Sequence, residues 1–196
     1  MKKQPISKIE EINNFFGDMD LFLIDQVLKG RLNNSMNVLD VGFGLGRNLV
    51  HFIQEGYHVY GIDKDKSAVD FFKASLSQNQ ILQLKENFKV GHTDNLNYPQ
   101  EAFSLVICSR VLHLLGSREE FSKSICEIHR VLKKKGIFYL TFNILSDSDE
   151  PSKLYFVPDE SDVKFIEHLQ FSKLEPRKTV LFDDEVTEVT MVLQKN

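Results

Sequence analysis

The stretch that most constrains this chain spans residues 37–48 and reads NVLDVGFGLGRN. It begins with an apolar run that contains one carboxylate, Asp40, and continues with three glycines on alternate positions. An amphipathic segment, LVHFIQEG, follows directly. Glycine tolerates positive φ angles and has no Cβ, so the backbone of such a turn can lie close to a ligand. The stretch predicts a buried strand, a tight turn that meets a ligand, and the N-terminus of a helix.

Strand-like and helix-like segments alternate through the rest of the middle of the chain. Helical periodicity separates four further strand-like runs, at 57–63, 88–91, 103–108 and 137–142. This alternation is typical of βαβ units and a mostly parallel sheet. Two last strands flank the acidic turn 183–185 and predict a C-terminal hairpin with an antiparallel strand. The fold class predicted is therefore α/β.

The composition is that of an ordinary globular domain, with 196 residues of which 42% are hydrophobic and 27% charged. We expect a single domain with an N-terminal helical lid or cap (1–35), a cofactor-binding core (36–143) and a C-terminal helix and hairpin (144–196). The net charge of −4 disfavours a nucleic-acid surface. Because metal-ligand spacing, a signal peptide and a membrane-length apolar run are absent, we expect a cytoplasmic protein without membrane or metal.

A long helix is predicted at residues 118–134. Ser117 and Glu120 have the spacing of a capping box at its start, and Gly136 is expected to stop it. The lysines at 133–135 would then lie at its C-terminus, where positive charge suits the helix dipole. They are interpreted as a solvated helix end rather than as a partner site.

Polar side chains stand at the end of each of the first four predicted strands. In an open parallel sheet these ends meet at one edge, where ligands bind. A nucleoside requires such groups, namely a carboxylate for the ribose hydroxyls and polar groups for the adenine amine. A carboxylate ahead of the glycines suits a cationic ammonium or sulfonium better than a pyrophosphate. The glycine spacing also departs from G-x-G-x-x-G, and no P-loop lysine follows it.

Together these segments resemble the class I S-adenosyl-L-methionine-dependent methyltransferases. VLDVGFGLGRN is similar to motif I of that family, and GIDKD, GHTDNL, FSLVICSRVLHLL and HRVLKKKGIFYLTF follow in the family's order. The resemblance covers roughly residues 37–143 and implies a Rossmann-like, doubly wound, seven-stranded sheet. GRN and EGYHVYGIDKD are also similar to the small bacterial tellurite-resistance and thiol methyltransferases. FDDEVTEV, however, replaces the His-Arg pair of the tellurite enzymes.

The resemblance implies a role for each strand-end residue. The glycine turn would face the methionine moiety, with Phe43 narrowing the mouth of the site. Asp63 would hold the ribose, and residues 94–95 would contact the adenine. Arg110 and His113 would lie beside the sulfonium or the acceptor as candidate catalytic residues. The full predicted cofactor-binding set is Asp40, Gly42, Phe43, Gly44, Gly46, Arg47, Asn48, Asp63, Lys64, Thr93, Asp94, Asn95 and Ser109.

Each of these residues also has an ordinary structural interpretation that the sequence leaves open. Asp40 and Asp63 can be capping or turn residues only, and 94–95 can be a polar turn. Residues 47–48 can belong to the first turn of a helix, and His113 can be a packed histidine. Three aromatic residues of the N-terminal helices can belong to the core rather than to a lid: Phe15, Phe16 and Phe22.

Methyl transfer from a sulfonium is a direct displacement, so the protein mainly supplies alignment and excludes water. A general base is needed only when the nucleophile arrives protonated, and His113 or Arg110 is the predicted helper. We expect S-adenosyl-L-methionine as cofactor, S-adenosyl-L-homocysteine as product, a small-molecule acceptor and a monomer or homodimer. A nucleoside-binding regulatory module without turnover is the alternative. An NAD-dependent oxidoreductase is disfavoured by the glycine spacing.

Overall fold

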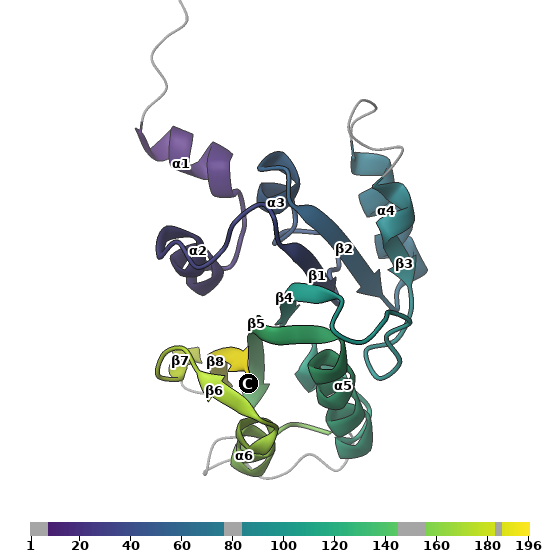
Figure 1. Ribbon diagram of the computed structural model, residues 1–196, viewed down its shortest axis with the longest axis vertical. Helices are drawn as coiled ribbons and strands as arrows, with labels where there is room; N and C mark the ends of the chain where they lie inside the picture. The colour runs from purple at the N-terminus through teal and green to yellow at the C-terminus, as the bar shows by residue number, and fades with distance from the viewer. Residues whose placement is uncertain (1–7, 77–83, 145–155, 183–185) are drawn as a thin grey trace, which may run out of the picture.

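The computed structural model describes residues 8–76, 84–144, 156–182 and 186–196 (Figure 1). A mixed sheet forms its centre, in which β1 to β5 run parallel and β5 pairs with β8 antiparallel. The strands follow one another across the sheet in the order β3 (Phe88–Val90), β2 (His58–Asp63), β1 (Asn37–Val41), β4 (Phe103–Ser109), β5 (Leu132–Ile144), β8 (Val186–Lys195) and β6 (Phe171–Lys173).

An eighth strand, β7 (Lys178–Phe182), also pairs with β8. Strand β5 pairs with one edge of β8, and both β6 and β7 pair with the other edge. The eight strands therefore fill seven positions across the sheet. The predicted seven-stranded, mostly parallel sheet with an antiparallel end is therefore confirmed. The first hairpin strand is divided in two near Pro176, a residue that has no N–H to donate to a ladder.

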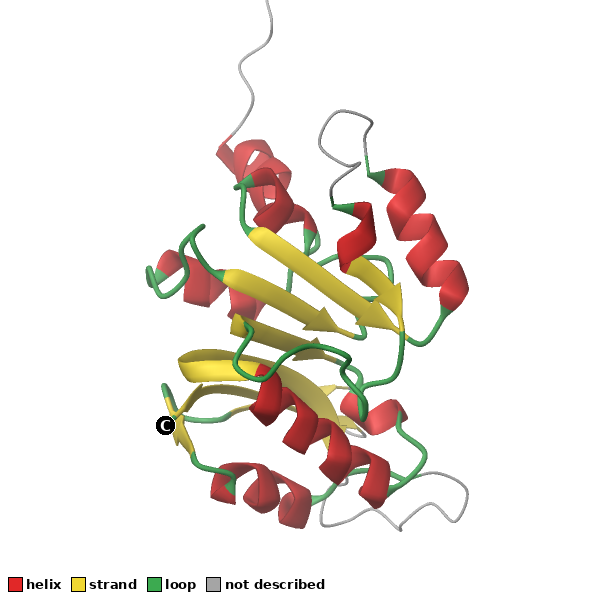
Figure 2. Ribbon diagram, turned by 45° about the vertical axis from the view of Figure 1, so that its right-hand side comes forward, coloured by secondary structure: helices red, strands yellow, loops and turns green. Residues whose placement is uncertain are grey.

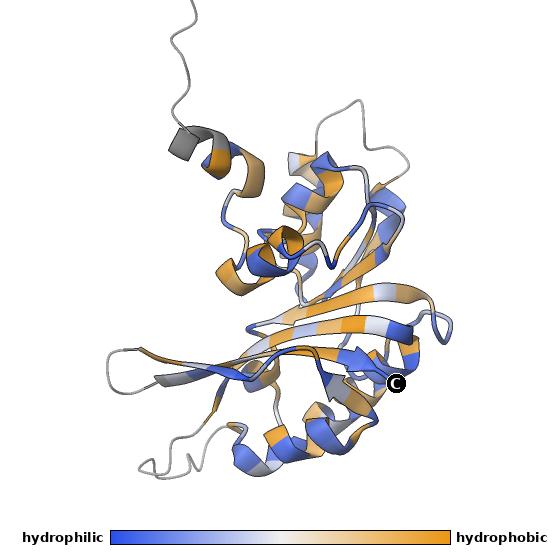
Figure 3. Cartoon of the chain, turned by 60° about the vertical axis from the view of Figure 1, so that its left-hand side comes forward, coloured by the Kyte–Doolittle hydropathy of each residue, from blue (hydrophilic) through white to orange (hydrophobic). Residues whose placement is uncertain are grey.

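Helices cover both faces of the sheet, as the predicted doubly wound architecture requires (Figure 2). Their inner faces are apolar and their outer faces polar, so hydrophobic and hydrophilic positions alternate along them (Figure 3). None of the described helices is long and apolar enough to cross a membrane. One face carries α1 (Lys8–Phe16), α2 (Leu21–Leu28), α3 (Val50–Gln54) and α4 (Lys66–Ser75), and the other α5 (Arg118–Val131) and α6 (Glu160–His168).

Two helix boundaries differ from those predicted. Helix α3 begins at Val50, because residues 47–48 make tertiary contacts before it. Helix α5 starts at its Ser117 cap as predicted but ends at Val131. Leu132 is buried and pairs with Phe103 as the first residue of β5, so the lysines at 133–135 lie in that strand and not at a helix end.

The carboxyl ends of β1, β2, β3 and β4 lie at one edge of the sheet. The strand order reverses between β1 and β4, which pair directly although β2 and β3 intervene in the sequence. Ligands of open α/β sheets bind beyond such a reversal. The loops after these strands therefore build the candidate site.

Candidate functional site

The glycine turn after β1 has left-handed backbone at all three glycines, with φ angles of +76°, +56° and +81° at Gly42, Gly44 and Gly46. A Cβ at Gly42 would lie 2.4 Å from the Val111 side chain, and one at Gly46 would lie 2.0 Å from the Phe72 ring. A Cβ at Gly44 would meet nothing within 4 Å. Gly42 and Gly46 therefore permit close packing, whereas Gly44 leaves open space beside the turn.

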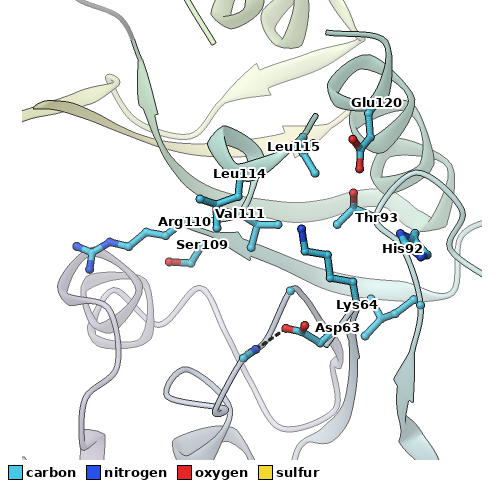
Figure 4. A pocket seen from close by; sticks show the side chains of 14 residues that line it. Asp63, Lys64, His92, Thr93, Ser109, Arg110, Val111, Leu114, Leu115 and Glu120 are labelled. Atoms are coloured by element: carbon cyan, nitrogen blue, oxygen red, sulfur yellow. Dashed lines mark hydrogen bonds between the residues drawn. The ribbon is translucent and has the colours of Figure 1, made fainter. Parts of the chain in front are cut away.

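Asp63, at the end of β2, holds the glycine turn in place. Its Oδ2 accepts a hydrogen bond from the Gly44 N–H at 2.7 Å (Figure 4). Its Oδ1 accepts one from the Asp65 N–H at 2.9 Å. A carboxylate oxygen can accept more than one hydrogen bond, so both oxygens keep acceptor capacity. Asp63 is thus a structural residue of the turn that can still bind hydroxyl groups.

Three adjoining cavities follow this edge of the sheet. The glycine-turn cavity, about 610 Å³, lies between the turn and residues 17–18. It shares Gly42, Gly44 and Ser109 with a central cavity of about 220 Å³. The central cavity shares residues 91–92 with an outer cavity of about 520 Å³. A long ligand can therefore lie along the edge in contact with the ends of β1, β2, β3 and β4.

Asp40 lies on the floor of the glycine-turn cavity and is 2% exposed. Its carboxylate has no hydrogen-bond partner within the described part of the chain. Burial raises its pKa to about 7, which Arg47 opposes and the charge of Asp63 favours. A buried carboxylate that faces a cavity without a bound partner is arranged to receive a cation.

Arg47 and Asn48 hold the segment between α1 and α2 over the glycine-turn cavity. Asn48 is buried, and its Oδ1 accepts a hydrogen bond from the Asp20 N–H at 2.9 Å. Arg47 donates to the Asp18 carbonyl at 3.4 Å and to the Ser109 hydroxyl at 2.8 Å. Gly17 and Asp18 accordingly line the cavity. These contacts are not those of ordinary first-turn helix residues.

The aromatic residues of this region divide between core and surface. Phe16 is buried, whereas Phe15 is 42% exposed. His51 contacts both rings and donates its Nδ1–H to the Phe15 carbonyl at 3.1 Å, a link that the sequence did not indicate. The ring of Phe43 packs into the core against Phe72, at a centroid distance of 5.2 Å. Phe43 also contributes to the lining of the glycine-turn cavity, and its role at the mouth of the site stays a prediction.

The loop after β3 lines the other end of the edge. Asp94 and Asn95 line the outer cavity, and Lys64 and Thr93 line the central one (Figure 4). Thr93 also shares a hydrogen bond with Ser124 of α5, at 2.6 Å. Two further α5 residues, which the sequence did not indicate, also anchor this loop. Arg130 donates to the Leu96 and Tyr98 carbonyls, and Glu127 accepts from the Leu96 N–H.

Arg110 follows β4 with a φ of +61°, an uncommon angle for a side chain that is not glycine. Its backbone N–H donates to the Thr141 carbonyl at 2.7 Å, and its side-chain Nε–H donates to the buried Glu188 carboxylate at 2.7 Å. Figure 4 shows its side chain directed away from Asp63. Arg110 thus binds Thr141 of β5 and Glu188 of β8. The residues around Arg110 in the sequence do not indicate either partner.

His113 is half-buried at the same loop and lines none of the three cavities. Its Nδ1 accepts a hydrogen bond from the Asn143 N–H at 3.2 Å, so a neutral ring carries its proton on Nε2. Burial lowers its pKa, which Glu188 opposes and Arg110 favours. In this tautomer Nε2 carries the proton and is a hydrogen-bond donor. It therefore cannot take a proton from the molecule that receives the methyl group.

Residues 39–140, just over half of the chain, match the sequence model of the methyltransferase domain family. The chain belongs to this family. The match runs from β1 through the first part of β5 and includes the glycine turn, Asp63 and the loop after β4. No curated protein matches the sequence.

Many solved structures share the fold of this methyltransferase. They include the 4+2 cyclase SpnF (16% identity, TM-score 0.71, covering 89% of this chain and 80% of that one). A SAM-dependent methyltransferase from Methanosarcina mazei matches with 19% identity and a TM-score of 0.66, covering 86% and 96%. TehB from Haemophilus influenzae matches with 20% identity and a TM-score of 0.68, covering 88% of this chain and 62% of that one. At these identities the likeness shows the fold, here the class I methyltransferase fold.

Proposed function

We propose that this protein binds S-adenosyl-L-methionine along the three adjoining cavities and transfers its methyl group to a small-molecule acceptor. The observation that carries the proposal is the buried Asp40 carboxylate, which faces the glycine-turn cavity without a partner. Asp63 stands at the end of the neighbouring strand, on the same edge. Family membership supports methyl transfer, and the pair of carboxylates supports this cofactor.

The chemistry of the donor set fits such a cofactor. Asp40 suits the cationic amino-acid end, and the open space beside Gly44 lets that end lie against bare backbone. Asp63 retains the acceptor capacity that ribose hydroxyls need. Apolar side chains of the central cavity, Ile62, Leu114 and Leu115, suit the faces of an adenine ring. The outer residues 94–95 supply polar groups for its exocyclic amine.

When bound, S-adenosyl-L-methionine supplies a methyl group already activated by its sulfonium, and S-adenosyl-L-homocysteine is the product. The protein's own residues then have to align the acceptor and exclude water. The segment held by Arg47 and Asn48 lies over the glycine-turn cavity and serves the second task. It belongs to residues 1–35, which we propose as the cap of the 36–143 core, with 144–196 completing the sheet.

A small acceptor is favoured because the same segment covers the cavity beside Asp40 and Ser109. The net charge of −4 gives no support to a nucleic-acid acceptor. Both cysteines are free thiols, one buried and one exposed, which suits the proposed cytoplasmic setting. We propose that the protein acts there as a monomer or a homodimer.

The test is transfer of a radiolabelled methyl group to a panel of thiols, selenite, tellurite, small carboxylates and amines. We expect label in at least one acceptor, and its loss in Asp63→Ala. Asp159→Asn is the matched control, because Asp159 caps the remote helix α6. A complete blank with the cofactor still bound would contradict turnover and favour the nucleoside-binding regulatory module.

A further inference from the structure

The central cavity has polar groups on two opposite sides. Asp63 stands on one side, and Glu120 of α5 stands on the other with its carboxylate directed toward the Thr93 hydroxyl (Figure 4). Apolar side chains line the same cavity, among them Val111 and Leu115. A ligand that crosses this cavity from Asp63 therefore meets apolar surface and then the oxygens of Glu120 and Thr93.

Glu120 is held firmly in place. Its N–H donates to the Ser117 hydroxyl at 3.1 Å, and its backbone carbonyl accepts from the Ser124 hydroxyl at 2.7 Å. In the side chain, Oε2 accepts a hydrogen bond from the Gly116 N–H at 2.8 Å. Oε1 has no hydrogen-bond partner in the described part of the chain. Glu120 thus presents one fixed, uncommitted acceptor at the cavity wall.

The Thr93 hydroxyl is a second acceptor at this wall. It shares a hydrogen bond with the Ser124 hydroxyl at 2.6 Å. The Ser124 hydroxyl has a single hydrogen and donates it to the Glu120 carbonyl, which can only accept. The hydrogen between Thr93 and Ser124 therefore comes from Thr93. What Thr93 Oγ1 still offers to the cavity is its lone pairs.

Two acceptors on one wall require donors from the ligand, because polar groups that lose water are almost always paired. An exocyclic amine on a purine ring has two N–H groups and suits such a pair. A ribose hydroxyl also donates, but its proposed partner, Asp63, lies on the opposite side of the cavity (Figure 4). Residues 94–95 line the outer cavity and not the central one, so they approach the base from another side.

The cationic side chains around the cavity leave Glu120 to the ligand. Arg110 is bound to Glu188 and is directed away from Asp63 (Figure 4). Lys64 and His92 line the cavity as well, and both are exposed and accessible to water. Within the described ranges, no hydrogen bond or salt bridge joins Lys64 or His92 to Glu120.

We propose that Glu120 and Thr93 recognise the exocyclic amine of the cofactor's adenine and determine which base the site accepts. This inference rests on the proposed function. Glu120 Oε1 and Thr93 Oγ1 each accept one N–H of the amine, in addition to the polar groups that residues 94–95 supply. A base with a carbonyl oxygen in place of the amine directs an acceptor at two acceptors. The site therefore selects adenine over hypoxanthine.

The first test needs only the wild-type protein. Titration calorimetry compares S-adenosyl-L-homocysteine with S-inosyl-L-homocysteine, in which a carbonyl oxygen replaces the amine. We expect the inosyl compound to bind roughly 10–100-fold more weakly, the usual effect of leaving buried hydrogen-bonding groups unpaired.

The second test is Glu120→Gln. The Gly116 N–H requires an acceptor, so the glutamine carbonyl oxygen should take the place of Oε2 and its NH₂ group that of Oε1. The variant then offers a donor where the wild type offers an acceptor. S-adenosyl-L-homocysteine should bind roughly tenfold more weakly and the inosyl compound more tightly than in the wild type.

Glu119→Gln is the matched control for this variant. Glu119 precedes Glu120 in the same helical turn, but its side chain is 76% exposed and pairs with Lys123. The substitution makes the same chemical change outside the cavity, so both affinities should stay at their wild-type values.

Failure of the wild type to bind S-adenosyl-L-homocysteine would refute the proposed function and this inference with it. Tight binding of that compound with equal affinity for the inosyl compound would overturn the inference alone. Two results in Glu120→Gln would also overturn it. One is unchanged binding of both compounds, and the other is an equal loss for both, which would give Glu120 a merely structural role.

Discussion

Asp40 should make cofactor affinity depend on pH. In the free protein its pKa is about 7, because burial disfavours the charged form. A bound cation favours the ionised carboxylate, so binding should release a proton and strengthen as the pH rises. With a pKa near 7, roughly a tenth of the carboxyl is ionised at pH 6 and roughly nine tenths at pH 8. The expected gain in affinity is about tenfold, or about 1.4 kcal/mol.

The burial of Asp40 should also lower the free energy of unfolding when no cofactor is bound. The pKa of Asp40 is raised from 3.8 to about 7, so the folded state holds a proton that the unfolded state has lost. The free energy of unfolding therefore falls as the pH rises from about 4 to 7. Asp40→Asn removes this term and should stabilise the cofactor-free protein by roughly 4 kcal/mol at pH 8, since a shift of about 3 pKa units corresponds to about 1.4 kcal/mol per unit. The two proteins should converge near pH 4.

Two assays separate these effects. Titration calorimetry in buffers with different ionisation enthalpies measures the proton released on binding, which should be about half a proton at pH 7. Chemical denaturation from pH 4 to 8 measures the stability difference. Asp40→Asn should bind S-adenosyl-L-methionine weakly and without this pH dependence. Wild-type affinity that is constant from pH 6 to 8, or that rises toward low pH, would refute the reasoning about Asp40.

Three further predictions concern packing and the cap. Gly46→Ala should destabilise the protein by roughly 1–3 kcal/mol in chemical denaturation through overpacking, and by more than Gly44→Ala, which has open space. Asn48→Ala should raise hydrogen exchange at residues 15–20 and leave the strand amides protected; unchanged exchange at 15–20 would show that the Asn48 hydrogen bond does not hold this segment. Tyr139→Phe should leave stability unchanged or raise it by about 1 kcal/mol, since it removes an unpaired hydroxyl; a marked loss would mean that the hydroxyl is paired.

Local sequence patterns predicted the elements that depend on local chemistry. The alternation of strands and helices gave the sheet, and the Ser117 cap marked the start of α5. The glycine turn and Asp63 were predicted to share an edge, and the hydrogen bond from the Gly44 N–H joins them directly. Parallel strands place their carboxyl ends together whatever fills the loops, so such positions follow from topology alone.

The remaining features depend on partners that are distant in the sequence. Asn48 binds the backbone of Asp20, 28 positions earlier, and Arg110 binds Glu188, 78 positions later. A polar residue in a loop does not reveal which distant group it will meet. The sequence predicted too late an end for α5 for a similar reason. The burial and strand pairing of Leu132 outweigh the local signal of the lysines at 133–135 and of Gly136.

The central claim is that the edge beside Asp40 and Asp63 binds S-adenosyl-L-methionine. Titration calorimetry of the wild-type protein with S-adenosyl-L-homocysteine tests it most directly, with NAD as the comparison ligand. We expect one site with a dissociation constant on the order of micromolar, about −8 kcal/mol, and no heat with NAD. Binding of NAD with no response to S-adenosyl-L-homocysteine would contradict the claim.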